Sequence, residues 1–322
     1  MLIRGGATQV VNTFAEDVRE GLGRTGQKEL PAKYFYDETG SALFELITKL
    51  PEYGLTRAEE RILLRHSAAI AERLTAHGMV VELGSGTGRK TRRILEALTR
   101  HQPTTYCPIE ISSAALESCE RELDDLAHVS IVGFETEYLD GLRRALARRR
   151  PGDGVVVLFL GSSIGNFDRG PGEDFLREIR EELAPGDALL LGTDLEKPLA
   201  QLIAAYDDAL GVTAEFNRNL LARINRELGG DFDLARFEHV ALYNARERRI
   251  EMHLRSVENQ TVTIEGANLR ATFRRDETIW TESCHKYARQ EAPGMASRTG
   301  FKCVAQWVDE EWAFAENLFV AE

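Results

Sequence analysis

Between Met79 and Gly192, short apolar segments alternate with segments of helical length and composition. The apolar segments are hydrophobic almost without interruption, which is typical of parallel strands covered by helices on both faces. We expect strands at Met79–Leu83, Thr105–Ile109, Val129–Val132, Val155–Leu160 and Ala188–Gly192, and helices at Arg89–Arg100, Ser112–Asp125 and Glu173–Leu183. This alternation predicts an open, doubly wound α/β domain.

The flanking segments have other patterns. The first sixty residues are expected to be helical, including Thr13–Leu22 and Ser41–Lys49, and a longer helix is expected at Arg57–Ala76. Two more helices are expected at Leu199–Leu210 and Thr213–Leu228. Four segments then alternate apolar and polar residues, as in an antiparallel sheet. They are Phe237–Asn244, Arg249–Arg255, Gln260–Ile264 and Leu269–Phe273.

The last two expected strands, Lys302–Val308 and Asn317–Val320, would close the first sheet as an antiparallel pair. The sequence therefore predicts two domains, each made of separate stretches of chain. Residues 58–195 and 287–322 are expected to form the α/β domain. Residues 1–57 and 196–286 are expected to form a second, α+β domain.

Composition excludes several classes of protein. The chain of 322 residues has 52 acidic and 40 basic side chains, a net charge of −12, whereas general nucleic-acid binding needs a dense basic surface. No apolar segment approaches the ~20 residues of a membrane span, and the opening residues Met1–Gly6 lack the apolar core of a signal peptide. We therefore expect a cytoplasmic protein without nucleic-acid or membrane partners, and we also expect a monomer.

Cysteine and histidine spacing gives no metal-binding pattern. The 4 cysteines and 7 histidines form no CxxC, HExxH or HxH motif, so no metal site is expected.

The strongest local motif is the glycine-rich turn Gly84-Ser85-Gly86-Thr87-Gly88, which follows an expected strand containing Glu82. Glycine allows positive φ and close approach to a ligand, with a helix N-terminus behind the turn. The nicotinamide fingerprint GxGxxG needs glycine at position 89, where this chain has Arg89. The spacing GxGxG after an acidic residue resembles instead the first motif of Rossmann-like S-adenosylmethionine (SAM) methyltransferases.

Two further motifs fall where expected parallel strands end. Glu110 follows the second strand, where a carboxylate can accept hydrogen bonds from the ribose hydroxyls of an adenosine. The alternative is an interaction with the dipole of the next helix. The turn Gly161–Asn166 follows the fourth strand, and Asn166 offers an acceptor and two donors to an amine or a carboxylate. The alternative is an asparagine that tolerates a left-handed turn.

Longer runs cover much of the chain: Lys33–Phe44, Leu50–Glu59, Glu82–Thr87, Leu160–Asn166, Leu191–Asp194, Ala205–Asn219, Asn225–Leu228 and Phe237–Val240. Together they resemble the histidine-specific SAM-dependent methyltransferase family, especially its branch that methylates the α-amine of histidine. The resemblance implies a Rossmann-like class I SAM methyltransferase domain with a second, substrate-binding domain. It also implies Nα-trimethylation of L-histidine to hercynine, the first step of ergothioneine biosynthesis.

The resemblance also implies roles for individual residues. The positions that hold SAM in the family correspond to Tyr36, Gly84, Ser85, Gly86, Lys90, Glu110, Glu137 and Tyr138. The positions that contact the substrate correspond to Tyr53, Gly161, Asn166, Tyr206, Phe216, Met252, Glu282 and Cys284. Among these, Met252 and Glu282 would surround the imidazole, while Tyr36 and Asn166 would act in catalysis by orienting the amine. No metal is implied.

One position departs from the family pattern Glu-x-Ser-x-Lys, because Cys284 stands where serine is expected. A thiol donates and accepts hydrogen bonds more weakly than a hydroxyl, so one imidazole contact would be missing or would come from a neighbour such as His285. Three alternatives therefore stay open. They are a family member acting on another amino acid such as tryptophan, a non-catalytic SAM- or amino-acid-binding protein, and a nicotinamide oxidoreductase, which Arg89 disfavours.

Overall fold

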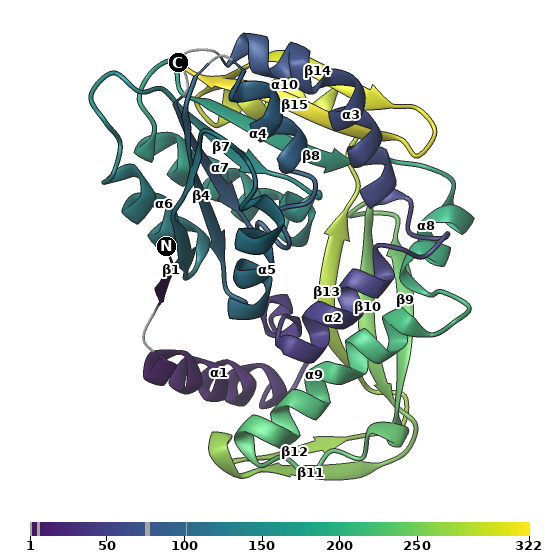
Figure 1. The fold of residues 1–322 in the computed structure, drawn as a ribbon. Coiled ribbons are helices and arrows are strands. Elements are labelled where there is room, and N and C mark those ends of the chain that lie inside the picture. Colours follow the sequence, from purple (N-terminus) through teal and green to yellow (C-terminus); the bar gives the residue numbers. More distant parts are fainter. Residues whose placement is uncertain (1, 5–6, 75–77, 101) are drawn as a thin grey trace. The chain divides into compact units, whose positions relative to one another are not determined.

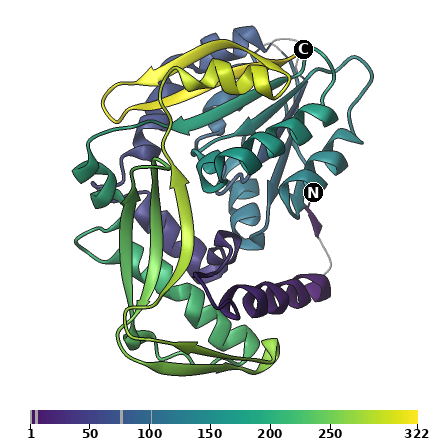
Figure 2. The same cartoon turned by 180° about the vertical axis from the view of Figure 1, so that it is seen from behind.

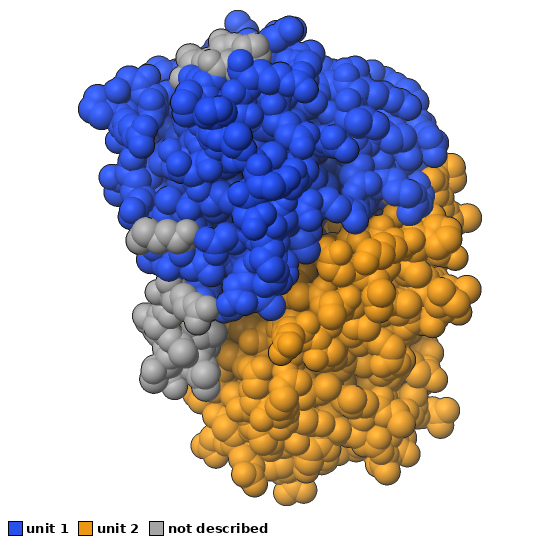
Figure 3. Space-filling view, in the orientation of Figure 1, with its two compact units in different colours: residues 1–5, 55–197, 285–322 blue, residues 6–54, 198–284 orange. Residues whose placement is uncertain are grey.

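The computed structural model describes residues 2–4, 7–74, 78–100 and 102–322, and it divides into two compact units (Figure 3). Unit 1 comprises Met1–Gly5, Leu55–Lys197 and His285–Glu322, and unit 2 comprises Gly6–Gly54 and Pro198–Cys284. The divisions at 54/55, 197/198 and 284/285 lie close to the expected ones at 57/58, 195/196 and 286/287.

Unit 1 contains one large sheet with the strand order β1-β6-β4-β3-β7-β8-β15-β14, and β5 pairs with β4. The strands are β1 (Leu2–Arg4), β3 (Met79–Leu83), β4 (Thr104–Glu110), β5 (Val129–Ile131), β6 (Gly133–Glu135), β7 (Val155–Phe159), β8 (Ala188–Asp194), β14 (Phe301–Asp309) and β15 (Phe314–Ala321). The pairs from β1 to β8 are parallel, whereas β15 runs antiparallel to both β8 and β14. The expected doubly wound sheet, closed by an antiparallel pair, is confirmed.

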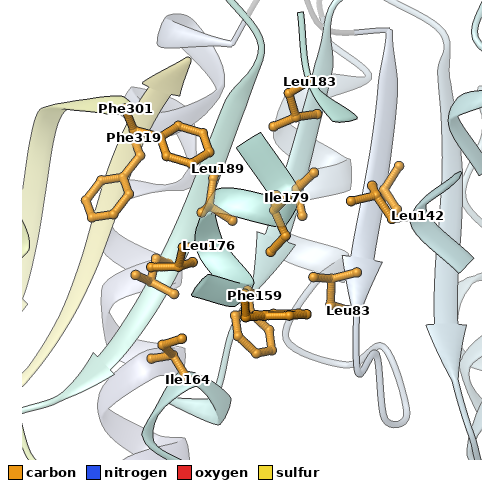
Figure 4. Close-up of a cluster of buried hydrophobic side chains, with 14 of the residues drawn as sticks. Leu83, Leu142, Phe159, Ile164, Leu176, Ile179, Leu183, Leu189, Phe301 and Phe319 are labelled. Atoms are coloured by element: carbon orange, nitrogen blue, oxygen red, sulfur yellow. The ribbon is translucent and has the colours of Figure 1, made fainter. Parts of the chain in front are cut away.

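Helices cover both faces of this sheet (Figure 1). One face packs against α6 (Tyr138–Leu146), α7 (Arg169–Glu182) and α10 (Glu291–Arg298), and the other against α3 (Leu55–Arg73), α4 (Arg92–Leu98) and α5 (Ser113–Leu123). Each face carries one cluster of buried apolar side chains: the first cluster lies under α6, α7 and α10, and the second under α3, α4 and α5. Side chains alternate along a strand, so Val81 and Leu83 of β3 belong to the first cluster and Val80 belongs to the second. Figure 4 shows members of the first cluster, including Leu83, Phe159 and Leu176.

The strand order reverses beside β3. From β3 the chain builds β4 and β6 on one side, and it then builds β7 and β8 on the other. In such sheets, ligands bind at the carboxyl ends of the strands that flank the reversal. The glycine-rich turn follows β3, and Gly161–Asn166 follows β7. The fold therefore brings both motifs to the same edge of one sheet.

Unit 2 combines helices with a sheet of order β2-β13-β10-β9 and a separate hairpin, β11–β12. Its helices are α1 (Ala7–Leu22), α2 (Glu38–Ile47), α8 (Leu199–Tyr206) and α9 (Val212–Leu228), with short 3-10 turns at η1 (Ala32–Phe35), η3 (Leu234–Arg236) and η4 (Glu265–Ala267). Its strands are β2 (Lys28–Glu29), β9 (Phe237–Asn244), β10 (Arg249–Ser256), β11 (Gln260–Ile264), β12 (Leu269–Phe273) and β13 (Thr278–His285). Figure 2 shows β9, β10 and β13 side by side.

Several expectations need correction. The first residues are not all helical, because β1 pairs with β6 in unit 1 and β2 pairs with β13 in unit 2. The four alternating segments do not form one sheet, since β11 pairs with β12 and not with β9 or β10. Strands β13 and β6 and helix α10 were not among the expected elements. Among the described residues, no helix is long and apolar enough to cross a membrane.

Candidate functional site

The glycine-rich turn leaves open space beside its backbone. Gly84, Gly86 and Gly88 have φ of +75°, +52° and +73°, the left-handed region that glycine adopts readily. A Cβ on Gly88 would lie 2.6 Å from Cys119 Sγ, whereas a Cβ on Gly86 would meet no atom within 4 Å. Gly88 is therefore required for packing, and the backbone at Gly86 is open to a ligand.

Glu110, at the end of β4, is held by backbone donors. It accepts hydrogen bonds from the N–H groups of Gly86 at 3.1 Å, Ile111 at 2.8 Å and Ser112 at 3.3 Å. Burial raises the pKa of Glu110, and these hydrogen bonds lower it only in part. A carboxylate has about four acceptor positions, so Glu110 can still accept from a hydroxyl.

Ser85 gives a second sign of a ligand at this turn. Its Oγ is buried, and apart from an interaction with the weakly accepting Cys119 thiol it has no hydrogen-bond partner among the described residues. Buried polar atoms normally have partners, so an atom of this kind marks a position where a ligand can supply one. The open backbone at Gly86, the Glu110 carboxylate and Ser85 Oγ together fit a nucleoside.

Glu82, the acidic residue of the motif, lies in β3 and stabilises the start of the turn. It is buried, and Thr91 Oγ1, which donates one proton, lies 2.7 Å from both of its carboxylate oxygens. The Tyr106 hydroxyl also donates to it. Burial raises the pKa of Glu82 to about 7, even though the hydrogen bonds from these hydroxyl groups act to lower it. Glu82 therefore ties β3 to β4 and to the start of α4.

Glu137 and Tyr138, the expected adenine positions, begin α6 directly after β6. Glu137 is exposed at the N-cap of α6. The Tyr138 ring packs edge-on against Phe159, with centroids 5.6 Å apart. A Cβ on Gly84 would lie 3.1 Å from the Tyr138 hydroxyl. The structure thus brings Tyr138 against the glycine-rich turn.

Lys90 and Gly161 share one partner, Glu59 of α3. Glu59 is fully buried; it pairs with Lys90 Nζ through Oε2, and its Oε1 accepts from Gly161 N at 2.5 Å. Burial lowers the pKa of Lys90, but the charge and hydrogen bond of Glu59 and the neighbouring carboxyl groups Glu82 and Glu316 together raise it more, so the net pKa is raised. Glu59 therefore joins an expected SAM residue to an expected substrate residue within unit 1.

A second buried carboxyl group, Glu316 of β15, interacts with Glu59. Burial and the charge of Glu59 raise the pKa of Glu316 well above its usual range. Two neighbouring carboxyl groups avoid repulsion when one of them keeps its proton, so the raised pKa of Glu316 indicates that Glu316 is the neutral one. Neither residue was an expected site residue, although Glu59 ends the run Leu50–Glu59 that carries the resemblance.

The turn after β7 is constrained by a neighbouring strand. Ser162 has a φ of +60°, which is unusual for a residue other than glycine. Its Oγ accepts a hydrogen bond from Asp194 N at 2.8 Å, and its carbonyl accepts one from Gly165 N at 2.8 Å. These bonds hold the short helix η2 (Ser163–Asn166), which presents Asn166 on the surface of unit 1.

The residues that follow Cys284 have structural partners in unit 1. Lys286 is fully buried and lies 2.9 Å from Asp194 Oδ2. Burial raises the pKa of Asp194, but Lys286 and Lys197 together lower it by more than burial raises it, so the net pKa is lowered. His285 Nε2 lies 3.3 Å from Asp168 Oδ1. The lysine of the Glu-x-Ser-x-Lys pattern therefore stabilises the end of β8.

In unit 2, Tyr36, Tyr53, Tyr206 and Phe216 form one aromatic cluster with Phe44. Ring centroids lie 5.7 Å apart for Tyr36 and Phe44, and 6.3 Å apart for Phe44 and Tyr53. They lie 6.3 Å apart for Tyr53 and Tyr206, and 6.0 Å apart for Tyr36 and Phe216. These pairs meet edge to face, as aromatic rings prefer. Four expected site residues are thus neighbours in one cluster.

The position of Tyr36 depends on the next residue. Asp37 caps α2, because its Oδ1 accepts from Gly40 N at 2.7 Å. The same oxygen accepts from Asn219 Nδ2 at 2.8 Å. A Cβ on Gly40 would lie 1.7 Å from the Phe35 carbonyl oxygen, so only glycine fits there. The turn that holds Tyr36 therefore explains why Asp37 and Gly40 stand at this spacing within the run Lys33–Phe44.

Cys284 contacts the aromatic cluster directly, because the Tyr206 hydroxyl lies 2.7 Å from Cys284 Sγ. Both side chains are buried, as is Met252 of β10. Thr281 Oγ1 donates to the Met252 carbonyl at 3.0 Å and so connects β13 to β10. Glu282 lies next to this connection on β13 and is half-buried.

No group of three or more His, Cys, Asp or Glu side chains in the described part of the chain could hold a metal ion. A model of the histidine-specific, SAM-dependent methyltransferases matches residues 14–321. The chain is 42% identical to the histidine N-alpha-methyltransferase of Mycobacterium tuberculosis, over 94% of this chain and 93% of that protein.

Two further relatives are similar over most of this chain. The histidine N-alpha-methyltransferase of Mycolicibacterium smegmatis is 40% identical, over 98% of this chain and 97% of that protein. Ergothioneine biosynthesis protein 1 of Neurospora crassa is 32% identical over 88% of this chain, which corresponds to 32% of that longer protein.

Glu316→Gln and Glu59→Gln form a matched pair of variants. Glu316→Gln replaces a protonated carboxyl group by an amide of similar shape, so we expect the free energy of unfolding to change by less than about 1 kcal/mol. Glu59→Gln leaves Lys90 without its anion. Because 27% of the Lys90 side chain is exposed, we expect a loss of about 2–3 kcal/mol, below the cost at a fully buried pair. Denaturant titration measures both, and equal losses would contradict a neutral Glu316.

Proposed function

Since the chain belongs to the histidine-specific, SAM-dependent methyltransferase family, we propose that it transfers methyl groups from SAM to the α-amine of L-histidine. Three transfers would give hercynine, the first step of ergothioneine biosynthesis. The observation that carries this proposal is the nearly full-length similarity to histidine N-alpha-methyltransferases. The retained Glu282 and Met252, at positions that would surround the imidazole, support it.

Bound SAM supplies an electrophilic methyl group on a sulfonium ion. In this proposal the glycine-rich turn holds the amino-acid half of SAM through its open backbone at Gly86. Glu110 accepts a hydrogen bond from the ribose, and Ser85 Oγ gains a stronger hydrogen-bond partner than the Cys119 thiol. Glu137 and Tyr138 contact the adenine, and Lys90 is held in place by Glu59.

The amino acid is held by its polar groups. Asn166 and Tyr206 bind the carboxylate and the amine, Tyr53 and Gly161 complete these contacts, and Tyr36 and Asn166 orient the amine. The neutral amine attacks the methyl group in line with the departing sulfur, after losing its proton to water. Orientation of the two reactants can supply up to about 7–11 kcal/mol of barrier reduction, so alignment is the main task of these residues.

The aromatic cluster of unit 2 suits a substrate nitrogen that becomes permanently charged. A quaternary ammonium ion cannot donate hydrogen bonds, but it is attracted to aromatic faces. Tyr36, Phe44 and Tyr53 are half-buried or buried members of this cluster. They would keep the mono- and dimethylated amino acids bound well enough to receive a further methyl group.

The experiment that tests the function is product analysis. The purified protein is incubated with SAM and, separately, with each of the twenty amino acids, and products are identified by mass spectrometry. We expect histidine to gain three methyl groups and the other amino acids to react much more slowly. Preferred methylation of tryptophan would identify a different substrate within the family. Binding of SAM without any product would identify a non-catalytic protein.

Glu282→Ala should weaken histidine selectively. The carboxylate would accept a hydrogen bond from the imidazole N–H, and hydrogen bonds to charged groups contribute about 1.5–3 kcal/mol. The KM for histidine should therefore rise about tenfold to a hundredfold. The KM for tryptophan, whose indole makes no equivalent bond in this proposal, should change little. Steady-state kinetics with both amino acids decide, and a similar rise for both substrates would contradict this role.

Cys284→Ser restores the side chain that the family pattern contains. A hydroxyl accepts the Tyr206 O–H and donates to the imidazole better than a thiol does. We therefore expect the KM for histidine to stay equal or to fall, with kcat unchanged. A large loss of kcat/KM in this variant would show that the thiol itself is needed.

A further inference from the structure

Two side chains of unit 2 without a role in the proposed reaction, Asn217 and His239, form a hydrogen-bonded chain that ends on Tyr206. Asn217 Nδ2 lies 2.9 Å from His239 Nδ1 and 3.1 Å from the His253 carbonyl oxygen. His239 Nε2 lies 2.8 Å from the Tyr206 carbonyl oxygen. His239 belongs to the run Phe237–Val240, to which the sequence analysis gave no function.

The orientation of Asn217 determines which nitrogen of His239 carries the proton. The His253 carbonyl oxygen can only accept a hydrogen bond, so Asn217 must direct its NH₂ group, and not its oxygen, at it. The same NH₂ group then donates to His239 Nδ1, which must be the unprotonated nitrogen. The proton of the neutral ring is therefore on Nε2, and it points at the Tyr206 carbonyl oxygen.

The Tyr206 carbonyl is a group that requires a partner. Tyr206 is the last residue of α8, and the last four carbonyl groups of a helix have no partner within the helix. Tyr206 is also buried, with 7% of its surface exposed, so an unpaired carbonyl there would be costly. His239 donates to this carbonyl and so fixes the end of α8 at the residue whose side chain enters the aromatic cluster.

The sheet of unit 2 brings His239 to the correct face. In the antiparallel pair β9–β10, His239 lies opposite Leu254, and Ala241 lies opposite Met252. Side chains alternate along strands, so His239 and Met252 share one face of this pair. Burial lowers the pKa of His239, although the Tyr206 carbonyl, Asp207 and Asp208 raise it and Arg218 lowers it further.

We propose that His239, held by Asn217 as the neutral Nε2–H tautomer, is a positioning residue for Tyr206. Through Tyr206 it fixes the hydroxyl group that donates to Cys284 and binds the amino-acid substrate. The identity of that substrate rests on the proposed function. The hydrogen-bonded chain Asn217–His239–Tyr206 rests on the structure alone.

Two isosteric variants separate positioning from general stability. Glutamine places its amide nitrogen where His239 Nε2 lies, so His239→Gln can still donate to the Tyr206 carbonyl. Asparagine places its amide oxygen where Nδ1 lies, so His239→Asn can still accept from Asn217 but cannot reach Tyr206. We expect His239→Asn to raise the KM for histidine about tenfold, the equivalent of one buried hydrogen bond. His239→Gln should restore a KM near that of the unchanged protein.

The KM for SAM is the internal control, and it should stay the same in both variants. Thermal unfolding is measured alongside. A merely structural role would lower the Tm of both variants without separating their KM values for histidine. Equal KM values for histidine in His239→Asn and His239→Gln would overturn the proposal.

The tautomer is tested without any enzymatic activity. The protein with ¹⁵N-labelled histidine side chains is studied by NMR, and the His239 signals are assigned by their loss in His239→Gln. We expect a protonated Nε2 and an unprotonated Nδ1 at pH 7. A proton on Nδ1, or on both nitrogens, would overturn the proposal even if histidine is the substrate. If no amino acid is methylated, the proposed function fails while this measurement still decides the state of His239.

Discussion

The reversal of strand order between β3 and β7 is the constraint on which unit 1 depends. Both strands are entirely buried, so they offer no polar group to a ligand, and chemistry is confined to the turns at their carboxyl ends. The glycine-rich turn and Gly161–Asn166 meet there because the sheet is parallel. Glu59, from a helix on one face, then bonds Lys90 and Gly161 and so fixes the relation between these turns. A single buried carboxylate thus serves both the expected cofactor residues and the expected substrate residues.

The sequence predicted those features whose signal is local. Continuous apolar runs identified β3, β4, β7 and β8, and the glycine spacing identified the turn after β3. The sequence analysis missed β6, which has three residues, and β13, whose polar residues Thr281–Ser283 hide any apolar run. It also missed partners that only tertiary contact brings together. Glu59 and Gly161 are 102 residues apart, and His239 and Tyr206 are 33 apart. Local sequence patterns, which span a few neighbouring residues, cannot show contacts between residues so far apart in the chain.

In unit 2, hydrogen bonds next to the aromatic cluster position its tyrosines, as the parallel sheet positions the two turns in unit 1. Asp37 receives hydrogen bonds from both Gly40 and Asn219, and it thereby holds the turn with Tyr36 against α9. His239 does the same for the end of α8. Aromatic packing alone tolerates small rotations of the rings, whereas these hydrogen bonds define particular backbone positions. The departure at Cys284 therefore acts within a fixed frame, where it changes the chemistry of one contact and not the placement of its neighbours.

The position of β15 has a consequence for the order in which the protein can be completed during synthesis. This strand lies between β8 and β14, although it is the last of the three to leave the ribosome. The edge of β8 thus stays unpaired while the ribosome makes the whole of residues 198–284, which belong to unit 2. Exposed strand edges invite pairing with other chains. The nascent protein must therefore protect this edge for the time needed to translate more than one hundred residues, from the end of β8 at Asp194 to Ala321.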